Sequence, residues 1–408
     1  MSEICVLGLG YIGLPTALML ASCGKKVVGV DINKELVKKL NGGKLTFEEA
    51  GLLDLFEMAA KNGIRFKGDC TKAEIYIIAV PTPFNTETKK IDPSYVIKAV
   101  EDVLAVCPKG AIIVIESTIS PGTTDKFIRP LPAAHGFIAG EDIHIVHAPE
   151  RIIPGKMIAE LKENSRTIGA DCESIAKRVR DLYSCFCEGE IVITDIRTAE
   201  ITKVVENTFR DVNIAFANEL AKICRQDNLD VYEIIRIANM HPRVNILQPG
   251  PGVGGHCISV DPWFLVGDYP QLSLIIHEAR KINDSMPSFV LKRVRDIIEE
   301  NNLPPSTQVG FYGITYKEDV DDIRESPTLQ IYELMKNHLG GNAKFYDPYC
   351  VETVLDGQMH DFDEFLEVCD LIVVMVGHGH IRKNIDKLQN KQVLDTKNAC
   401  DLPNVHKL

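Results

Sequence analysis

Residues 3–31, EICVLGLGYIGLPTALMLASCGKKVVGVD, decide the fold of the amino-terminal part of the chain. A short apolar run leads into the pattern G-x-G-x-x-G, and a helical pattern and a second apolar run follow it. Between a strand and a helix, Gly8 would make the tight turn, Gly10 would admit a pyrophosphate, and Gly13 would let the helix pack on the strand. Asp31 would accept hydrogen bonds from ribose hydroxyls and repel a 2′-phosphate, so we expect NAD rather than NADP. The competing interpretation is a parallel α/β unit without a ligand.

Three further apolar runs predict that this unit is a parallel sheet covered on both faces, because continuous apolar strands are typical of such sheets. The runs span residues 75–80, 111–117 and 143–148. Ligands of doubly wound sheets bind at the carboxyl ends of the strands. The polar segments at those ends are residues 81–83, 116–118 and 149–151.

Composition narrows the class of protein. The 408 residues carry a net charge of −12, with 45% hydrophobic and 25% charged side chains, which is typical of a globular protein of two or three domains. The negative charge argues against nucleic acid or an anionic membrane as a partner. The sequence shows neither a bilayer-spanning run nor the features of a signal peptide. Twelve cysteines without ligand or framework spacing predict free thiols, no metal site and a reducing cytoplasm.

A long helix is expected in the middle of the chain. Residues 197–226 contain neither glycine nor proline and would form about 45 Å of helix. Apolar residues recur along it at helical spacing: Ile201, Val205, Phe209, Val212, Phe216, Leu220 and Ile223. Residues 228–239 and 269–300, interrupted at Pro287, are also expected to be helical. Long helices between two α/β units would form a subunit interface, so we expect a homodimer or homotetramer.

Residues 250–264, GPGVGGHCISVDPWF, place a cysteine after four glycines. The glycines let the backbone pass close to a ligand, and Cys257 would be a strong nucleophile near neutral pH. Asp261, four residues later, could sit beside a hydrolytic water. The alternative is that Cys257 is one more small buried apolar side chain. Lys203 and Asn207, four residues apart, share one face of the long helix, either as site residues or as a solvated stripe.

The carboxyl-terminal part begins after residues 301–306, which have the composition of a linker. Strands are expected at residues 308–313, 344–346, 371–377 and 393–395, and a helix at residues 327–338. This second α/β sheet has only G-x-x-G at Gly310 and Gly313, so it lacks the full dinucleotide pattern. Residues 316–327 lead from a strand into a helix start, where an anion would be stabilised. Without other information this segment would be interpreted as a solvated charge run.

These motifs together resemble the UDP-glucose/GDP-mannose dehydrogenase family along nearly the whole chain. The resemblance lies in the glycine pattern, GVGGHCISVDPWF at residues 252–264, Lys-x-x-x-Asn at 203–207, and K-x-D-x-x-D-x-R-x-S at 317–326. It implies an α/β fold of two Rossmann-like doubly wound parallel-sheet domains joined by a central helical domain. The expected boundaries are 1–195 for the NAD domain, 196–301 for the helical domain and 302–408 for the nucleotide-sugar domain.

The resemblance also implies residue roles. Thr82 and Thr118 would line the nicotinamide, Glu150 would help handle the catalytic water, and Arg243 would reach the substrate of a neighbouring subunit. The implied cofactor residues are Gly8, Gly10, Tyr11, Ile12, Gly13, Asp31, Thr82, Thr118 and Arg324. The implied substrate residues are Glu150, Arg151, Lys203, Asn207, Arg243, Gly254 and Lys317. The implied catalytic residues are Cys257, Lys203, Asn207, Asp261, Glu150 and Thr118.

The implied chemistry is an NAD-dependent four-electron oxidation of the C6 hydroxyl of a nucleotide sugar, through a thiohemiacetal and a thioester on Cys257. His256 and Val260 differ from the pattern of the glucose-oxidising members. Trp263 with Phe264 would suit an acetamido methyl group; the alternative is that both rings belong to the core. We therefore expect UDP-N-acetyl-D-mannosamine as substrate, with UDP-N-acetylglucosamine and UDP-glucose as alternatives. A two-electron hydroxyacid-type dehydrogenase and a non-enzymatic NAD-binding sensor are the alternatives from other classes.

Overall fold

The computed structural model describes residues 3–255, 257–338, 343–403 and 405–408. It divides into two compact units. The first comprises residues 1–206 and 263–269, and the second comprises residues 207–262 and 270–408. Two helices, α8 (Ile196–Gln226) and α10 (Asp261–Asp268), contribute residues to both units.

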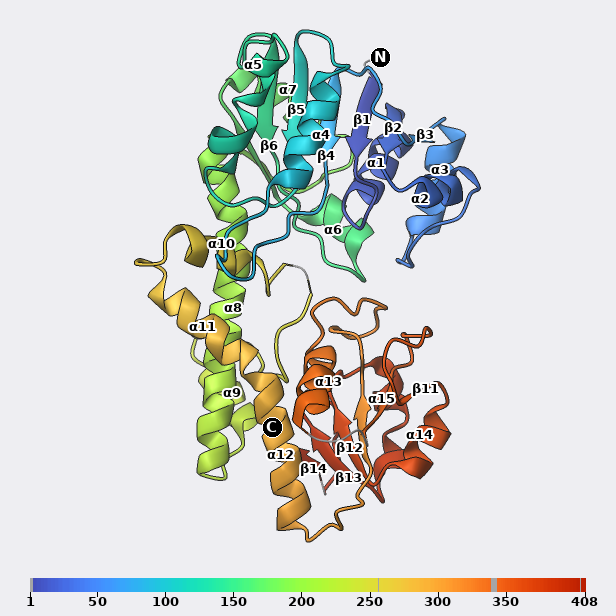
Figure 1. Cartoon of the computed structure of the whole chain (residues 1–408), viewed down its shortest axis with the longest axis vertical. Helices are drawn as coiled ribbons and strands as arrows, with labels where there is room; N and C mark the ends of the chain where they lie inside the picture. Colours follow the sequence, from blue (N-terminus) through green and yellow to red (C-terminus); the bar gives the residue numbers. More distant parts are fainter. Residues whose placement is uncertain (1–2, 256, 339–342, 404) are drawn as a thin grey trace. The chain divides into compact units, whose positions relative to one another are not determined.

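The first unit contains an eight-stranded sheet in the order β3-β2-β1-β4-β5-β6-β7-β8 (Figure 1). Its strands are β1 (Glu3–Leu7), β2 (Lys26–Val30), β3 (Arg65–Lys67), β4 (Ile75–Ile78), β5 (Ala111–Ile115), β6 (Ile143–His147), β7 (Arg166–Ala170) and β8 (Ile191–Thr194). The first six strands are parallel and have the order 3-2-1-4-5-6. That is the order of dinucleotide-binding sheets, so the predicted fold class is confirmed.

Helices cover both faces of this sheet, as the continuous apolar strands predicted. One buried cluster packs α1 (Gly13–Ser22), α3 (Leu52–Lys61) and α7 (Glu173–Tyr183) on one face, and a second packs α4 (Ser94–Leu104) on the other. The remaining helices are α2 (Lys34–Asn41), the π-helix η1 (Thr124–Ile128), α5 (Leu131–Ala134) and α6 (Met157–Glu163).

The last two strands of this sheet differ from the parallel expectation. β7 pairs with β6 in antiparallel register, His147 opposite Gly169, and β8 runs parallel to β7. Only the seven-residue helix α6 lies between β6 and β7, which is shorter than a usual parallel crossover. The reversal starts β7 at the edge where β6 ends, and this places Arg166 among the strand-end residues.

The second unit contains a six-stranded parallel sheet in the order β11-β10-β9-β12-β13-β14. Its strands are β9 (Val309–Tyr312), β10 (Ala343–Tyr346), β11 (Gln358–Met359), β12 (Leu371–Val374), β13 (Gln392–Asp395) and β14 (Val405–Lys407). Counted from β9, the order is again 3-2-1-4-5-6, so the second Rossmann-like sheet is also confirmed. Its helices are α13 (Pro327–His338), α14 (Phe362–Val368), α15 (Gly379–Lys383) and the short 3-10 helix η2 (Ile385–Leu388).

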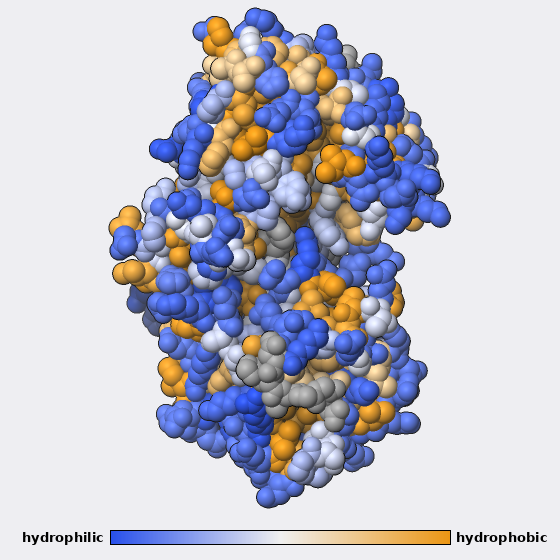
Figure 2. Space-filling model, in the orientation of Figure 1, coloured by the Kyte–Doolittle hydropathy of each residue, from blue (hydrophilic) through white to orange (hydrophobic). Residues whose placement is uncertain are grey.

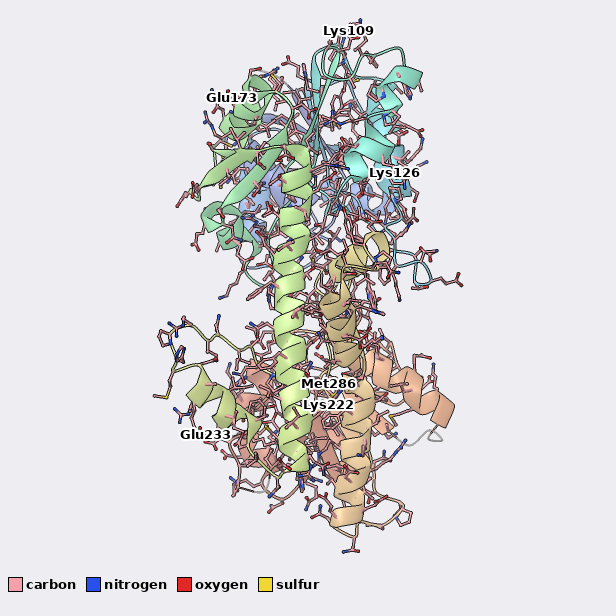
Figure 3. All side chains as sticks on the ribbon, turned by 90° about the vertical axis from the view of Figure 1, so that its left-hand side faces the viewer. Lys109, Lys126, Glu173, Lys222, Glu233 and Met286 are labelled. Atoms are coloured by element: carbon pink, nitrogen blue, oxygen red, sulfur yellow. The ribbon has the colours of Figure 1, made fainter. Side chains whose placement is uncertain are left out.

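The remaining helices of the second unit are α9 (Val231–Ala238), α11 (Leu274–Asp284) and α12 (Met286–Glu300). The predicted interruption near Pro287 occurs at Ser285, because Pro287 stands in the first turn of α12. Buried residues of α8, α9 and α12 share one hydrophobic cluster with β9, β10 and β12. In Figure 3, α8 faces the viewer and Lys222 on it lies beside Met286 of α12.

No helix among the described residues is long and apolar enough to cross a membrane. The face of the molecule in Figure 2 is mainly hydrophilic, with hydrophobic residues in small groups. Groups of this kind are ordinary on a protein surface and require no special explanation.

Candidate functional site

The glycine-rich turn after β1 has the geometry that a dinucleotide requires. Gly8 has a φ of +88°, and a Cβ there would collide with the backbone of Ala79. A Cβ on Gly13 would collide with the carbonyl of Gly8, whereas a Cβ on Gly10 would meet no atom within 4 Å. The turn is therefore tight at its first and third glycines and open at the second, where the pyrophosphate of NAD would approach. Tyr11, beside the turn, packs its ring 4.4 Å from that of Phe47.

Asp31 stands at the end of β2, next to this turn. Its carboxylate accepts hydrogen bonds from the backbone N–H of Leu9 and of Asn33, each at 2.8 Å. Asp31 therefore braces the glycine turn, and it is still partly exposed. Its side chain lies where the pattern places the residue that contacts the ribose of NAD.

The loops that follow β4 and β5 are tied to each other. Ser117 donates from its Oγ to the carbonyl of Val80 at 2.7 Å, so the segment that carries Thr118 is fixed against the one that carries Thr82. Thr82 is buried and Thr118 is partly buried. Glu200, on the first turns of α8, accepts from the N–H of Thr124 at 2.9 Å. The helix that carries Lys203 is thus anchored to the loop after β5.

Glu150 belongs to a buried ionic cluster that the sequence did not reveal. Its carboxylate pairs with the guanidinium of Arg166, and Arg166 also contacts Glu116 at 3.3 Å. Tyr183 donates to Glu116 at 2.8 Å and lies under the guanidinium, whose carbon is 4.3 Å from the ring centre. Burial raises the pKa of Glu116 to about 7. Arg166 is 50 residues from Glu116 and 16 from Glu150 along the chain, so only the reversed direction of β7 could have indicated this cluster.

Two further predicted residues of the first unit are at least partly withdrawn from solvent. Arg151 contacts the carboxylate of Glu206 at 2.7 Å and donates to Thr167 at 3.0 Å. Lys203 is buried, with 7% of its surface exposed. The solvated-stripe interpretation is therefore wrong for Lys203, since a buried ammonium needs a partner or a ligand.

The Cys257 segment packs against the loop that follows β9. A Cβ on Gly254 would lie 2.5 Å from the Cβ of Tyr316, and one on Gly255 would lie 2.8 Å from the ring of the same residue. The N–H of Gly255 donates to the carbonyl of Arg324 at 2.9 Å. At these two positions glycine is thus required by the protein's own packing rather than by a ligand. The structure brings the thiol segment and the segment of residues 316–327 together.

Cys257 is exposed, unlike most of the twelve free cysteines, so the buried-residue alternative is wrong. Its carbonyl accepts from the N–H of Asp261 at 2.8 Å, which closes the turn between the thiol and α10. Asp261 is buried and accepts from the Nδ2 of Asn207 at 2.6 Å. Asn207 on α8 is therefore joined directly to the acid that follows the thiol.

The other predicted residues of the second unit lie on loops. Arg324 is held against the carboxylate of Asp322 at 2.6 Å, on the loop that also carries Lys317. Arg243 is exposed, and its N–H donates to the ring of His241 at 3.3 Å. An outward-facing Arg243 is compatible with a role toward a second subunit.

The aromatic pair after Asp261 corrects one expectation. Phe264 is fully buried and Trp263 is 7% exposed, so the burial of both rings favours the alternative that they belong to the core. Trp263 stacks on Phe84 with ring centres 6.5 Å apart, and the Nζ of Lys89 lies 4.2 Å from its ring centre. Trp263 therefore packs against the loop that follows Thr82 and stabilises it. His256, which entered the same prediction, lies outside the described residues.

Three domain models of one family match the chain in order. Residues 2–187 match the NAD binding domain of the UDP-glucose/GDP-mannose dehydrogenase family, residues 197–285 match its central domain, and residues 310–402 match its UDP binding domain. The chain belongs to this family. The predicted NAD cofactor is confirmed, and the match to the UDP binding domain contains Lys317 and Arg324.

Relatives of this UDP-glucose/GDP-mannose dehydrogenase family member are similar over their whole length. A UDP-N-acetyl-D-mannosamine dehydrogenase of Methanococcus maripaludis is 43% identical over 98% of this chain and 93% of the relative. An NDP-N-acetyl-D-galactosaminuronic acid dehydrogenase of Ralstonia nicotianae is 41% identical over 97% and 95%. The solved UDP-N-acetyl-mannosamine dehydrogenase Cap5O of Staphylococcus aureus has a TM-score of 0.89, with 41% identity over 100% and 98%.

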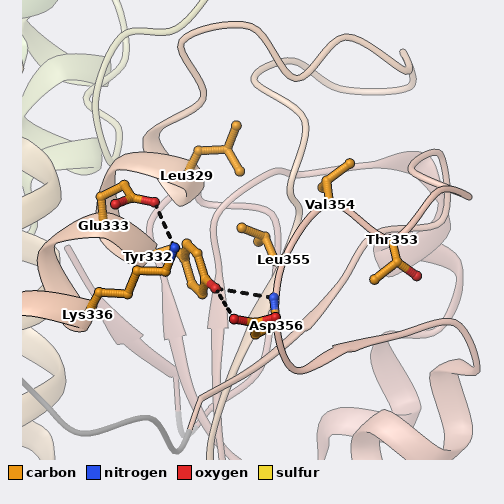
Figure 4. Close-up of a pocket in the computed structure, with 8 residues that line it drawn as sticks. All are labelled: Leu329, Tyr332, Glu333, Lys336, Thr353, Val354, Leu355 and Asp356. Carbon is orange, nitrogen blue, oxygen red and sulfur yellow. Dashed lines mark hydrogen bonds and ion pairs between the residues drawn. The ribbon is translucent and has the colours of Figure 1, made fainter.

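A pocket on the second unit lies apart from the residues predicted for the site. It has a volume of about 570 Å³ and lies between α13 and residues 353–356 (Figure 4). Tyr332 donates to Asp356 across it at 2.9 Å, and Lys336 covers the ring of Tyr332. None of its lining residues belongs to the family motifs, so we assign it no part in the reaction.

Proposed function

We propose that this enzyme oxidises the C6 hydroxyl of UDP-N-acetyl-D-mannosamine to the carboxylate, through covalent intermediates on Cys257. The observation that carries the proposal is the exposed thiol fixed beside the loop of Lys317 and Arg324, through Gly255 and the carbonyl of Arg324. An enzyme that only exchanged two electrons would need no nucleophile there. The identity to UDP-N-acetyl-D-mannosamine dehydrogenases supports the choice of sugar.

The chain's own residues have separate tasks in this scheme. NAD, when bound, accepts one hydride in each of the two oxidations. The C6 hydroxyl loses a proton and a hydride to give an aldehyde, and the Cys257 thiol adds to it as a thiohemiacetal. Loss of a second proton and hydride leaves a thioester, which water cleaves to the carboxylate and the free thiol. Lys203 and Asn207 would stabilise the oxyanions, and Asp261 and Glu150 would orient and deprotonate the water.

The sugar specificity is tested by measuring NADH release with five nucleotide sugars in parallel. We expect UDP-N-acetylmannosamine to give the highest kcat/KM, with two NADH per sugar consumed. The other four are UDP-N-acetylglucosamine, UDP-N-acetylgalactosamine, UDP-glucose and GDP-mannose. UDP-N-acetylgalactosamine is included because one relative of nearly equal identity is named for the galactosaminuronic acid. A higher kcat/KM for any of these four would overturn the choice of sugar but leave the reaction type in place. One NADH per sugar would overturn the four-electron scheme.

We further propose that α8 forms the interface of a homodimer. The helix differs from an ordinary surface helix, whose large apolar side chains face the core, because several of its large apolar side chains face solvent. Five of its apolar side chains are exposed: Ile201, Val205, Phe209, Phe216 and Ile223. Five of its buried polar side chains recur on roughly the opposite side: Glu200, Lys203, Asn207, Asp211 and Asn218. A second copy would cover the apolar stripe, while the polar side serves the site.

We also place the enzyme in the cytoplasm, where free thiols persist.

Phe209→Glu or Phe216→Glu is expected to convert the dimer to a monomer at micromolar concentration. The new carboxylate would be an unpaired charge buried in an apolar interface. Light scattering measures the mass. Gln226→Glu adds the same charge at the exposed end of α8 and is expected to leave the dimer intact. A wild-type protein that is monomeric and fully active would contradict both the interface and any role of Arg243 across it.

A further inference from the structure

The segment that carries the thiol is tied to α8 at its start as well as at its end. The N–H of Gly250 donates to the Oδ1 of Asn218 at 2.9 Å, and both residues are buried. At the other end of the segment, Asp261 accepts from Asn207. Asn207 and Asn218 are eleven residues apart on one helix, which is about 16 Å along its axis. One rigid element therefore holds the segment on both sides of Cys257.

Asn218 is itself held by a chain of buried polar groups. Its Nδ2 donates to the Oδ1 of Asn283 on α11 at 2.8 Å. The Nδ2 of Asn283 donates to the Oδ1 of Asp211 at 2.8 Å and to the backbone carbonyl of Asp211 at 3.0 Å. Arg280 donates to the same carboxylate at 2.6 Å. The four side chains are no more than 2% exposed, so each hydrogen bond is shielded from water.

Residue 211 determines how the amides in this chain point. The Oδ1 and the backbone carbonyl of Asp211 both accept from Asn283, so Asn283 must turn its NH₂ group toward them. Arg280 donates to the same Oδ1, so this oxygen acts as an acceptor. The carbonyl of Asn283 then faces Asn218, whose NH₂ group donates to it. Asn218 is left with its carbonyl toward Gly250, where the backbone N–H needs an acceptor.

We propose that Asn218 and Asn283, oriented by the Asp211–Arg280 ion pair, are positioning residues that hold the Cys257 segment in its reactive conformation. The proposal rests on the proposed function in one respect, namely that Cys257 is the nucleophile. None of the four residues is needed to touch substrate or cofactor. Their effect on the reaction passes through the backbone at Gly250.

The test removes the amide at position 218. Asn218→Leu keeps nearly the same volume but leaves the N–H of Gly250 without its acceptor and the carbonyl of Asn283 without its donor. We expect kcat to fall roughly tenfold, because the start of the Cys257 segment loses its attachment to α8. Asn283→Leu removes only the group that orients Asn218 and is expected to give a smaller fall in kcat.

Hydrogen exchange in the full-length enzyme gives a readout that is independent of turnover. We expect faster exchange of the peptide that contains Gly250 in Asn218→Leu and in Asn283→Leu. Gln226→Leu is the matched control, because Gln226 lies exposed at the end of the same helix. It is expected to leave both the exchange and kcat unchanged.

The proposal is overturned if Asn218→Leu exchanges and turns over like the wild type, or if kcat falls without faster exchange at Gly250. If Asn218→Leu does not fold, the same two measurements on Asn283→Leu decide the question. Failure of the proposed function is a separate result. In that case Cys257→Ala would stay active, while the exchange at Gly250 would still report on the chain of amides.

Discussion

Replacing Cys257 with alanine is expected to lower the rate of carboxylate formation by a factor of about 10⁴ or more, because no other group can carry the thioester. Cys257 is exposed, and its side chain is not part of the buried core. The fold and the affinity for NAD should therefore be preserved, as circular dichroism and calorimetry can establish. Carboxylate formation near the wild-type rate would contradict covalent catalysis.

Two comparisons make this result specific to the thiol. Cys257→Ser is expected to form an ester with the oxidised sugar and to cleave it slowly, so the intact protein should gain the mass of the acyl group. Cys172→Ala is the matched control, since Cys172 is also exposed but lies in the first unit, just before α7. Its activity is expected to equal that of the wild type.

The parts of the fold that the sequence predicted are those encoded by short-range patterns. The glycines at 8–13 and Asp31 predicted a strand, a turn and a helix, because each residue's task there is set by neighbours within one βαβ unit. The unbroken pattern at 197–226 predicted α8, which spans Ile196–Gln226. In both places the local periodicity and the tertiary structure agree.

The parts that the sequence did not predict depend on contacts between distant segments. Arg166 meets Glu116 only because β7 runs antiparallel to β6. Asn218 meets Asn283 across 65 residues of chain. Such pairs leave no periodic signal, since each member alone is indistinguishable from a solvated polar residue. Buried amides and ion pairs become visible only when the topology is known.

Helix α8 shows that a local pattern can mislead about burial, because several of its large apolar side chains are exposed and several polar ones are buried. Its apolar repeat is real, but Phe209 is 64% exposed while Asp211, two residues later, is fully buried. A helix of this kind is stable only if both faces have partners: polar groups for one side and another apolar surface for the other. The buried side carries Asn207, which donates to Asp261, and this contact leads to the prediction with the second largest effect.

Replacing Asp261 with asparagine is expected to lower kcat by about 10² to 10³, by slowing hydrolysis of the thioester rather than its formation. Asp261 follows the thiol by four residues, is 3% exposed, and receives the Nδ2 of Asn207 at 2.6 Å. An amide at position 261 can still accept that hydrogen bond, so the turn should be kept. What is lost is the negative charge that, in the proposed scheme, orients and deprotonates the water.

The measurement is a rapid-mixing experiment with the substrate identified in the nucleotide-sugar comparison. The Asp261→Asn enzyme should release two NADH per active site in a fast burst and then turn over slowly, with the acyl group present on the peptide that contains Cys257. Asp227→Asn removes an exposed carboxylate just after the end of α8 and is expected to show steady turnover without a burst. If Asp261→Asn loses the burst as well, the carboxylate acts before the thioester forms. A wild-type steady rate would mean that Asp261 has no part in handling the water, leaving Glu150, held by Arg166, as the remaining carboxylate for that step.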